Sequence, residues 1–536
     1  MTSVSSMDNF SRTQIIRKAV IPSRGGVVAA AHRRAAEVGA SVLDAGGDAV
    51  DAAVAVSFAI GVVEPWMSGP AAGGAMVLWR AEESRARVVD YGMRSPVGLD
   101  PADYPLAGGG ATSRDLFAWP AVVDDRNVVG ATAVAVPGVV SGMGLAHAEY
   151  GRMPWRDLLA PAVSLAKEGL LVDWFSTLLT ASVARSLAAD PDAARMFLDD
   201  GIWPISGEWT FVIERHLDQS AMAVTLDRLA RNGPREFYEG EVARALVRDL
   251  RAKGSAMSEA DLAGYQAHIV DAQTVRYRDG RVHVAPGLTG GPTLAQALKI
   301  LETELTPARE KPGAVSYVAY ARALDQAFSA RFAGMGDVAG FAEAAHAPSC
   351  TTHFSVVDRD GNMCSVTQTL LSIFGSRVVS PSTGLLMNNG IMWFDPEPGK
   401  PNSLGPGKRC LANFCPVVGE AADGRRFALG ASGGRKIIGA VLQIISFIID
   451  HGLTLEEAFH QQRIDMSGAG KAMADRTLPQ PVIDALAAAF PTTIAVRTNF
   501  PYAFACPAAV LRDGDVNMGC TEIMSPWGDA VAEGGG

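Results

Sequence analysis

The sequence is poor in the residues that hold metals and disulfides. It has six cysteines in 536 residues, and all of them lie at or beyond position 350. No CxxC pair occurs, and the nine histidines show neither an HxxxH nor an HExxH spacing, so no zinc site is expected. We expect the cysteines to be small buried hydrophobic residues in a reducing compartment. Nothing in the sequence indicates a metal or another cofactor.

Long hydrophobic runs and an excess of positive charge are also missing. Asp51 interrupts the apolar segment 49–63, and the apolar segment 437–449 is too short to cross a bilayer. The first twenty residues contain no apolar core of signal-peptide length. The net charge of −10 argues against nucleic acid as a partner. We therefore expect a cytoplasmic protein with neither a nucleic-acid nor a membrane partner.

What the chain does have is enough apolar material for a large core. Hydrophobic residues make up 48% of the sequence, which excludes general disorder. Its length suits two or three average domains, or one large α/β unit. Residues 1–25 form a polar lead, and the last sixty residues are predicted to alternate short strands and turns. No internal repeat is present.

Several helix boundaries can be predicted from capping residues. Asp48 is the expected N-cap of an almost wholly apolar, buried helix over 49–62, which Glu64-Pro65 ends. Capping boxes are predicted to open two further helices, at Ser258-x-x-Asp261 and Thr454-x-x-Glu457.

Two alternating segments in the second half predict a β-hairpin. Thr352–Val357 and Met363–Thr369 flank a turn centred on Asp360-Gly361. A loop centred there pairs residues whose numbers sum to about 720, which places Thr351 opposite Thr369 with Cβ atoms roughly 5 Å apart. On the pattern alone, this pair is either a surface threonine ladder or part of a site.

The sequence segments around this threonine pair favour an active site. TTHFSVVDRDGN, from Thr351, resembles the start of the small subunit in the γ-glutamyltranspeptidase family of N-terminal-nucleophile hydrolases, and segments 31–65 and 133–172 are similar to the same family. The resemblance implies a four-layer αββα sandwich of the α/β (α+β) class. It also implies self-cleavage between Cys350 and Thr351, so that a large subunit (1–350) and a small subunit (351–536) of one precursor form one catalytic domain.

Chemistry explains why such a cut matters. A threonine hydroxyl is a poor nucleophile without an adjacent base, and an internal threonine has none. A free α-amine, with a pKa near 8, can take the hydroxyl proton directly or through one water. We therefore expect Thr351 to become the nucleophile after cleavage, with Thr369 orienting it. The short, Gly- and Ala-rich segment 333–350 is expected to be the linker that presents the bond.

The segment GASGGRK, from Gly430, has two interpretations. Gly430 to Gly434 satisfies G-x-S-x-G between a predicted strand and helix, which is typical of the nucleophile elbow of serine hydrolases. That triad needs an acid and then a histidine downstream, and only His451 and His460 follow, a few turns away. In the resembled family, the paired glycines supply the oxyanion hole, which here implies the N–H groups of Gly433 and Gly434.

The substrate-reading positions match the family less well. In that family, an arginine binds the substrate carboxylate, and a guanidinium group suits this role because it can form two hydrogen bonds to a carboxylate. Arg94 lies two residues beyond the matching position, which is Gly92. The alternative interpretation of Arg94 is an ordinary surface arginine. We retain Arg94 as a candidate substrate-binding residue.

Other family groups that read a glutamyl substrate are replaced. Leu371 stands where an asparagine holds the α-amine, Trp393 where an acidic residue is usual, and Ala412 and Asn413 where two serines bind the carboxylate. A site without a carboxylate for the α-ammonium should not favour a γ-glutamyl group. Trp393 and Asn413 are thus predicted to line the pocket for a different acyl group.

These features predict an enzyme that hydrolyses a small-molecule, non-glutamyl amide, with water resolving the acyl-enzyme. They resemble the divergent branch that includes cephalosporin-acylase-like proteins and oxamate amidohydrolases. Three alternatives remain open at this point: a true γ-glutamyl hydrolase or transpeptidase, a serine hydrolase, and an uncleaved binding module.

Overall fold

The computed structural model describes residues 17–113, 119–207, 214–334, 351–468, 470–498 and 501–534. Cys350 and most of the predicted linker lie outside these ranges, as does most of the predicted polar lead. Among the described helices, none is long and apolar enough to pass through a membrane.

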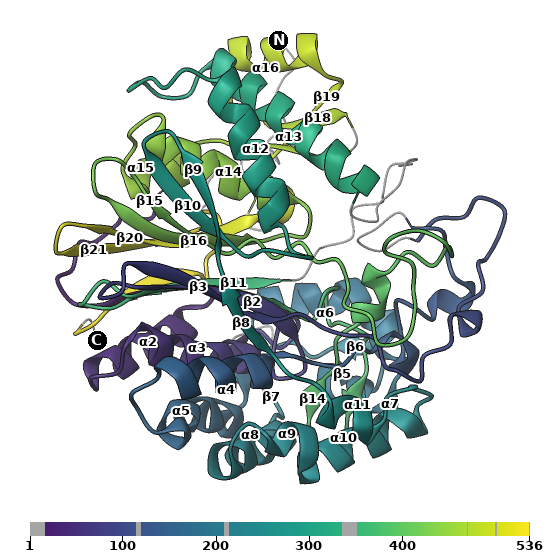
Figure 1. The fold of residues 1–536 in the computed structure, drawn as a ribbon. Coiled ribbons are helices and arrows are strands. Elements are labelled where there is room, and N and C mark those ends of the chain that lie inside the picture. Colours follow the sequence, from purple (N-terminus) through teal and green to yellow (C-terminus); the bar gives the residue numbers. More distant parts are fainter. Residues whose placement is uncertain are drawn as a thin grey trace.

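Two antiparallel sheets form the centre of the molecule (Figure 1). Across the first, the strands are β22 (Asp529–Ala532), β1 (Val27–Ala30), β11 (Thr352–Val357), β12 (Met363–Thr369), β2 (Gly73–Arg80), β3 (Arg85–Tyr91) and β8 (His268–Asp271). Across the second, they are β21 (Val516–Thr521), β20 (Cys506–Asp513), β16 (Arg426–Ser432), β15 (Val417–Glu420), β10 (Gly280–Val284) and β9 (Gln273–Tyr277).

Helices cover the outer face of each sheet (Figure 1). On the side of the first sheet lie α2 (Arg33–Asp44), α3 (Ala49–Val63), α4 (Val139–Tyr150), α5 (Trp155–Glu168), α6 (Trp174–Leu187), α7 (Pro191–Phe197), α8 (Ser220–Asn232), α9 (Glu236–Glu239), α10 (Glu241–Ala252) and α11 (Glu259–Ala263). On the side of the second lie α12 (Gly291–Glu304), α13 (Ala314–Gly334), α14 (Lys436–Ile449), α15 (Leu455–His460) and α16 (Gln480–Ala489).

Short strands complete the fold at its periphery. They form a three-stranded sheet of β17 (Ile464–Gly468), β18 (Lys471–Asp475) and β19 (Thr492–Ala495), and three pairs: β4 (Leu170–Leu171) with β7 (His216–Leu217), β5 (Leu198–Asp199) with β6 (Trp203–Pro204), and β13 (Val379–Ser380) with β14 (Leu385–Leu386).

Three apolar clusters fill the three spaces between the four layers. One joins the first sheet to its helices, one joins the second sheet to its helices, and the third lies between the sheets, where Val77 and Val510 belong to it. Burial on both faces of each sheet explains why strands such as β12 are apolar or neutral throughout. The predicted αββα sandwich is confirmed.

Both parts of the predicted precursor contribute to both sheets. In the first sheet, β11 and β12 from the second part lie between β1 and β2 from the first part. In the second sheet, β10 pairs with β15 across the same divide. A cut before Thr351 would therefore leave the two pieces held together by sheet hydrogen bonds and a shared core.

Local predictions from the sequence mostly hold. The N-cap at Asp48 and the capping boxes at Ser258 and Thr454 are confirmed. The hairpin register is also confirmed, because Thr352 pairs with Gln368. The prediction of only short strands and turns for the last sixty residues is wrong, since α16 lies there; Pro481 is compatible with the first turn of a helix.

Candidate active site

Thr351 and Thr369 meet at the open end of the β11–β12 hairpin. Thr351 Oγ1 donates a hydrogen bond to Thr369 Oγ1 at 3.4 Å, and Thr369 Oγ1 accepts the N–H of Leu371 at 2.8 Å. The exposed fractions are 5% for Thr351 and 0% for Thr369. A surface ladder of threonines would be solvated, so the interpretation of this pair as surface decoration is wrong. The pair lies inside the protein, as a site requires.

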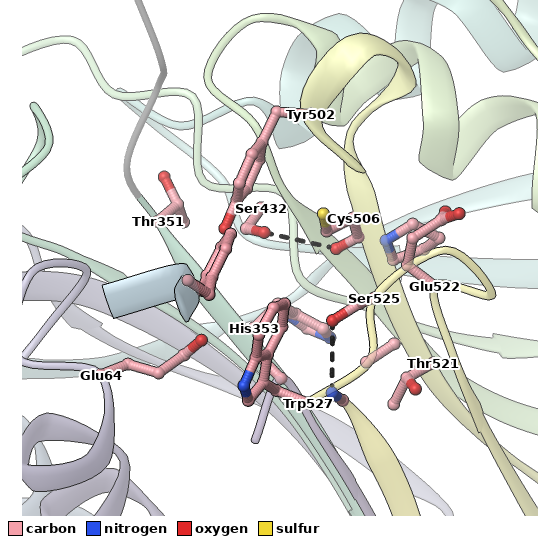
Figure 2. A pocket seen from close by; sticks show the side chains of 15 residues that line it. Glu64, Thr351, His353, Ser432, Tyr502, Cys506, Thr521, Glu522, Ser525 and Trp527 are labelled. Carbon is pink, nitrogen blue, oxygen red and sulfur yellow. Dashed lines mark hydrogen bonds between the residues drawn. The ribbon is translucent and has the colours of Figure 1, made fainter. Parts of the chain in front are cut away.

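A small cavity adjoins the nucleophile candidate (Figure 2). Thr351, Ser432 and Tyr502 lie along its upper side in this view, and His353 and Trp527 lie below them. Glu64 enters from the side of the first sheet, with its carboxylate directed into the cavity. Groups from both sheets thus converge on the start of β11.

The glycine loop lies between β16 and α14, as predicted. Gly433 and Gly434 have φ of +136° and +60°, a backbone region that residues other than glycine rarely adopt. A Cβ built on Gly433 would stand 2.9 Å from the Cα of Ala505, so this position also lacks room. The carbonyls of the two glycines accept the N–H groups of Lys436 and Ile437. Their own N–H groups lie at the helix N-terminus, where such donors can stabilise an oxyanion.

The structure gives no support to the nucleophile elbow. Ser432 Oγ donates to the Cys506 carbonyl at 3.5 Å. The ring nitrogens of the three histidines that could serve it are already bonded: His353 to Thr367 and Ser355, His451 to Glu310 and Tyr320, and His460 to Glu456 and Lys18. Burial also lowers the pKa of His353 to about 3, so this ring is a weak base. None of these three histidines therefore offers Ser432 a free ring nitrogen.

Arg94 lies in an isolated β-bridge with two other segments. It pairs with Val136 on one side and with Arg409 on the other. Arg409 donates to Asp90 at 2.6 Å, whereas Nε of Arg94 is buried without a hydrogen-bond partner in the described part of the chain. Two guanidinium groups thus lie on adjacent segments. Sequence reasoning missed Arg409, although the GKRCLANF segment contains it; the role of Arg94 in binding a carboxylate stays a prediction.

The positions that depart from the family pattern are buried and largely apolar. Of these positions, Leu371, Trp393 and Ala412 belong to the cluster between the sheets, where the Trp393 ring meets the ring of Phe414 edge-on at 5.2 Å. Leu371 has φ of +90°, a strained backbone for a leucine, two residues beyond Thr369. An apolar cluster, which we call the apolar wall, therefore begins two residues beyond Thr369. Trp393 and Asn413 are not among the residues that line the cavity at Thr351, so their contact with the acyl group stays a prediction.

Asn413 is hydrogen-bonded to Arg331 of α13, a partner that the sequence did not predict. Its Oδ1 accepts a hydrogen bond from Nη2 of Arg331 at 3.2 Å, and the same guanidinium donates to the carbonyls of Ala412 and Thr289. Sequence reasoning missed Arg331. The signal was its place four residues after the apolar Ala327 on α13, which puts a cation on the buried face of this helix.

Comparison with known proteins decides the family. A sequence model of the family described as Gamma-glutamyltranspeptidase matches residues 35–347 and 338–522. The acylase ACY 1 proenzyme of Pseudomonas sp. (strain V22) is 34% identical over 508 residues, covering 88% of each chain. The chain belongs to the gamma-glutamyltranspeptidase family.

Two further relatives show which members of the family the chain is similar to in sequence and in fold. The glutathione hydrolase proenzyme of Escherichia coli (strain K12) is 29% identical, with 82% of each chain covered. The crystal structure of cephalosporin acylase from Bacillus halodurans superposes with a TM-score of 0.82 at 25% identity, covering 96% of this chain and 97% of that one. The chain is thus an enzyme of the gamma-glutamyltranspeptidase family with the fold of an acylase relative.

One more residue of this gamma-glutamyltranspeptidase-family site was missed from the sequence. Glu64 ends α3 and accepts a hydrogen bond from Oγ1 of Thr352 at 3.1 Å. Burial raises the pKa of Glu64 to about 7. The only signal in the sequence was a carboxyl directly after a helix of buried residues.

Proposed function

We propose that the chain cuts itself before Thr351 and then hydrolyses small-molecule amides through a threonine acyl-enzyme, with a preference for acyl groups other than γ-glutamyl. The observation that carries the proposal is the buried Thr351–Thr369 pair in a chain of this family, with Thr351 lining one cavity together with Ser432, the residue directly before Gly433.

In the proposed reaction, the freed α-amine of Thr351 takes the proton of its own hydroxyl. Oγ1 then bonds to the carbonyl carbon of the substrate amide, and the N–H groups of Gly433 and Gly434 stabilise the resulting oxyanion. The C–N bond breaks as the leaving amine accepts the proton. Water adds to the ester, releases the acid and restores the hydroxyl. The Thr369 hydroxyl orients Oγ1 throughout, since it is held in place by the N–H of Leu371.

The apolar wall supports the substrate preference. A γ-glutamyl group carries an α-ammonium that needs a buried acceptor, and an ammonium without one is costly to bury. Leu371 and Trp393 offer no carboxylate, and they pack in an apolar cluster. The proenzyme named acylase among the relatives points the same way.

A γ-glutamyl hydrolase or transpeptidase is the second candidate. It is favoured by the two adjacent arginines, Arg94 and Arg409, which suit a substrate carboxylate, and by the glutathione hydrolase among the relatives. The two candidates differ in whether the α-ammonium is tolerated.

A matched pair of substrates separates them. Glutaryl anilide and γ-glutamyl anilide differ only in the α-amino group, and we expect kcat/KM to be at least about tenfold higher for the glutaryl compound, a difference of about 1.4 kcal/mol in transition-state binding. Faster turnover of the γ-glutamyl compound would favour the second candidate. Intact mass of the purified protein tests the cut: we expect two fragments meeting at Cys350 and Thr351, and an intact, active chain would contradict the proposal.

We also propose a cytoplasmic location. The five cysteines of the described part are free, and four of them are buried, as small hydrophobic residues are in a reducing compartment. Cell fractionation tests this, with recovery in the cytoplasmic fraction expected.

A further inference from the structure

Self-cleavage needs a base that the uncut chain does not have at Thr351. This inference rests on the proposed function, in which the α-amine of Thr351 is the base of the mature enzyme. Before the cut, the same nitrogen is an amide and cannot accept a proton. Thr369 supplies a hydroxyl, which is no base at neutral pH. Another group must therefore take the proton of Thr351 Oγ1 during maturation.

Glu64 lines the same cavity as Thr351. Its side chain reaches from the C-terminal end of α3, and Figure 2 shows the carboxylate directed into the cavity. The free volume is about 20 Å³, which suits one water molecule. The carboxylate of Glu64 and the hydroxyl of Ser432 offer that water polar partners. Thr351 lines the cavity with its hydroxyl directed away from Glu64 in Figure 2, so a rotation about its Cα–Cβ bond brings Oγ1 to the water.

The surroundings of Glu64 favour a carboxyl that can accept a proton near neutral pH. It is 5% exposed, and it lies at the negative end of the α3 dipole. No cation of the described residues forms an ion pair with it. Burial therefore raises its pKa to about 7, although the hydrogen bond from Thr352 opposes this rise.

The other ionisable groups of the cavity are unsuited to the task. Both ring nitrogens of His353 are bonded, and burial lowers its pKa to about 3. Burial opposes the ionisation of Glu522, but the adjacent cations, Arg497 and Arg463, nevertheless hold its pKa below the usual range. Burial raises the pKa of the Cys506 thiol well above its usual value.

A second cavity adjoins the first on the other side of Glu64. The two share Glu64, Phe175 and Trp527 as walls, and His32 and Asp173 line the second one. Burial lowers the pKa of His32 to about 4, so this ring is neutral near pH 7. Asp173 caps α6 and accepts the indole N–H of Trp527. Glu64 thus lies between the cavity of the nucleophile and a second small cavity, whose carboxyl, Asp173, is engaged by Trp527.

We propose that Glu64 is the general base of self-cleavage and receives the hydroxyl proton of Thr351 through water in the shared cavity. Oγ1 bonds to the carbonyl carbon of residue 350, and the proton passes to Glu64. The carboxyl then returns a proton to the nitrogen of Thr351 as the C–N bond breaks, which leaves an ester. Water hydrolyses the ester to the carboxyl end of residue 350 and the free hydroxyl of Thr351.

The test starts from full-length chain freshly made by cell-free synthesis. The rate at which fragment 351–536 appears is measured by mass spectrometry at several pH values. For the wild type we expect the cleavage rate to rise with pH through a midpoint near 7, because Glu64 must be ionised to accept the proton. For Glu64→Gln we expect the rate to fall at least about 100-fold and this midpoint to disappear. Glu64→Asp should restore part of the rate.

Two variants separate a proton-transfer role from a structural one. Thr352→Val removes the hydroxyl that donates to Glu64, so the midpoint of the cleavage rate should move to higher pH. Asp173→Asn changes a carboxyl of the adjoining cavity in the same way as Glu64→Gln, and should keep the wild-type midpoint and rate within about twofold. If Glu64→Gln fails to fold, the Thr352→Val midpoint decides.

The outcomes also separate this inference from the proposed function. A wild type that never yields a fragment beginning at Thr351 would overturn the proposed function. Wild-type cleavage together with unchanged rate and pH profile in Glu64→Gln, or an unmoved midpoint in Thr352→Val, would overturn only the role of Glu64.

Discussion

Thr369 and Leu371 lie two residues apart, yet they belong to regions with opposite character. Thr369 completes a polar centre with Thr351, in which each hydroxyl has a defined partner. Leu371 begins an apolar wall that continues through Trp393 and Phe414. The centre keeps the groups that this family needs for amide chemistry, whereas the wall replaces the groups that would read a glutamyl substrate. The contrast supports the proposal that the reaction and the choice of substrate depend on separate groups of residues.

The centre is also more tightly constrained than the wall. Gly433 has both a backbone angle and a space that only glycine fits. The wall consists of side chains that pack on one another, and such packing tolerates replacement by residues of similar volume. We therefore expect changes in the centre to abolish turnover and changes in the wall to alter selectivity.

The largest effect is expected at the nucleophile. Thr351→Ala should leave a single uncut chain and lower amide turnover at least about 10⁴-fold, because the proposed acyl-enzyme forms on the hydroxyl of Thr351. Intact mass and an anilide assay measure both. Ser432→Ala is the matched control and should keep amide turnover; loss of turnover in this variant, with turnover kept in Thr351→Ala, would instead support the serine elbow.

A change in the glycine loop should have the next largest effect. Gly433→Ala places a Cβ 2.9 Å from Ala505 and strains a φ of +136°, so the oxyanion donors move and kcat should fall about 10²–10³-fold. Gly452→Ala is the control, because Gly452 also has positive φ but open space around it. Equal loss of kcat in both variants would mean that the loss comes from backbone strain alone and not from displaced oxyanion donors.

The raised pKa of Glu64, near the polar centre, should make the stability of the fold depend on pH. Its pKa of about 7 in the fold exceeds the ordinary 4.5, so the folded chain holds this proton more tightly than the unfolded chain. Stability should therefore fall as pH rises from about 4.5 to about 7, by up to about 3 kcal/mol. Denaturant unfolding of uncut Thr351→Ala, with and without Glu64→Gln, measures it. Parallel curves for the two chains would refute the raised pKa.

The smallest effect is expected from the wall. Leu371→Asn restores a polar group where the family holds the α-amine, so the preference for glutaryl over γ-glutamyl anilide should narrow about tenfold while cleavage persists. The kcat/KM values for the two substrates measure the change. A uniform loss on both substrates would show instead that Leu371 serves the centre, through its N–H bond to Thr369.

The sequence predicts most of what is local. The Thr351–Thr369 meeting follows from hairpin register, and the N-cap at Asp48 follows from its side chain and the next turn. The layered sandwich follows from family resemblance rather than from residue patterns. Glu64 could not be assigned in advance, because its partner Thr352 is 288 positions away. The same holds for Arg331 with Asn413, which meet only through packing of α13.

The central claim is that Thr351 becomes the terminal nucleophile. Acid-quenched mass spectrometry of the purified protein during turnover of an anilide tests this claim most directly. We expect the acyl mass on fragment 351–536, mapped by peptide digestion to Thr351 itself. The same acyl mass on Ser432, or turnover by an intact chain whose Thr351 stays unmodified, would contradict the account.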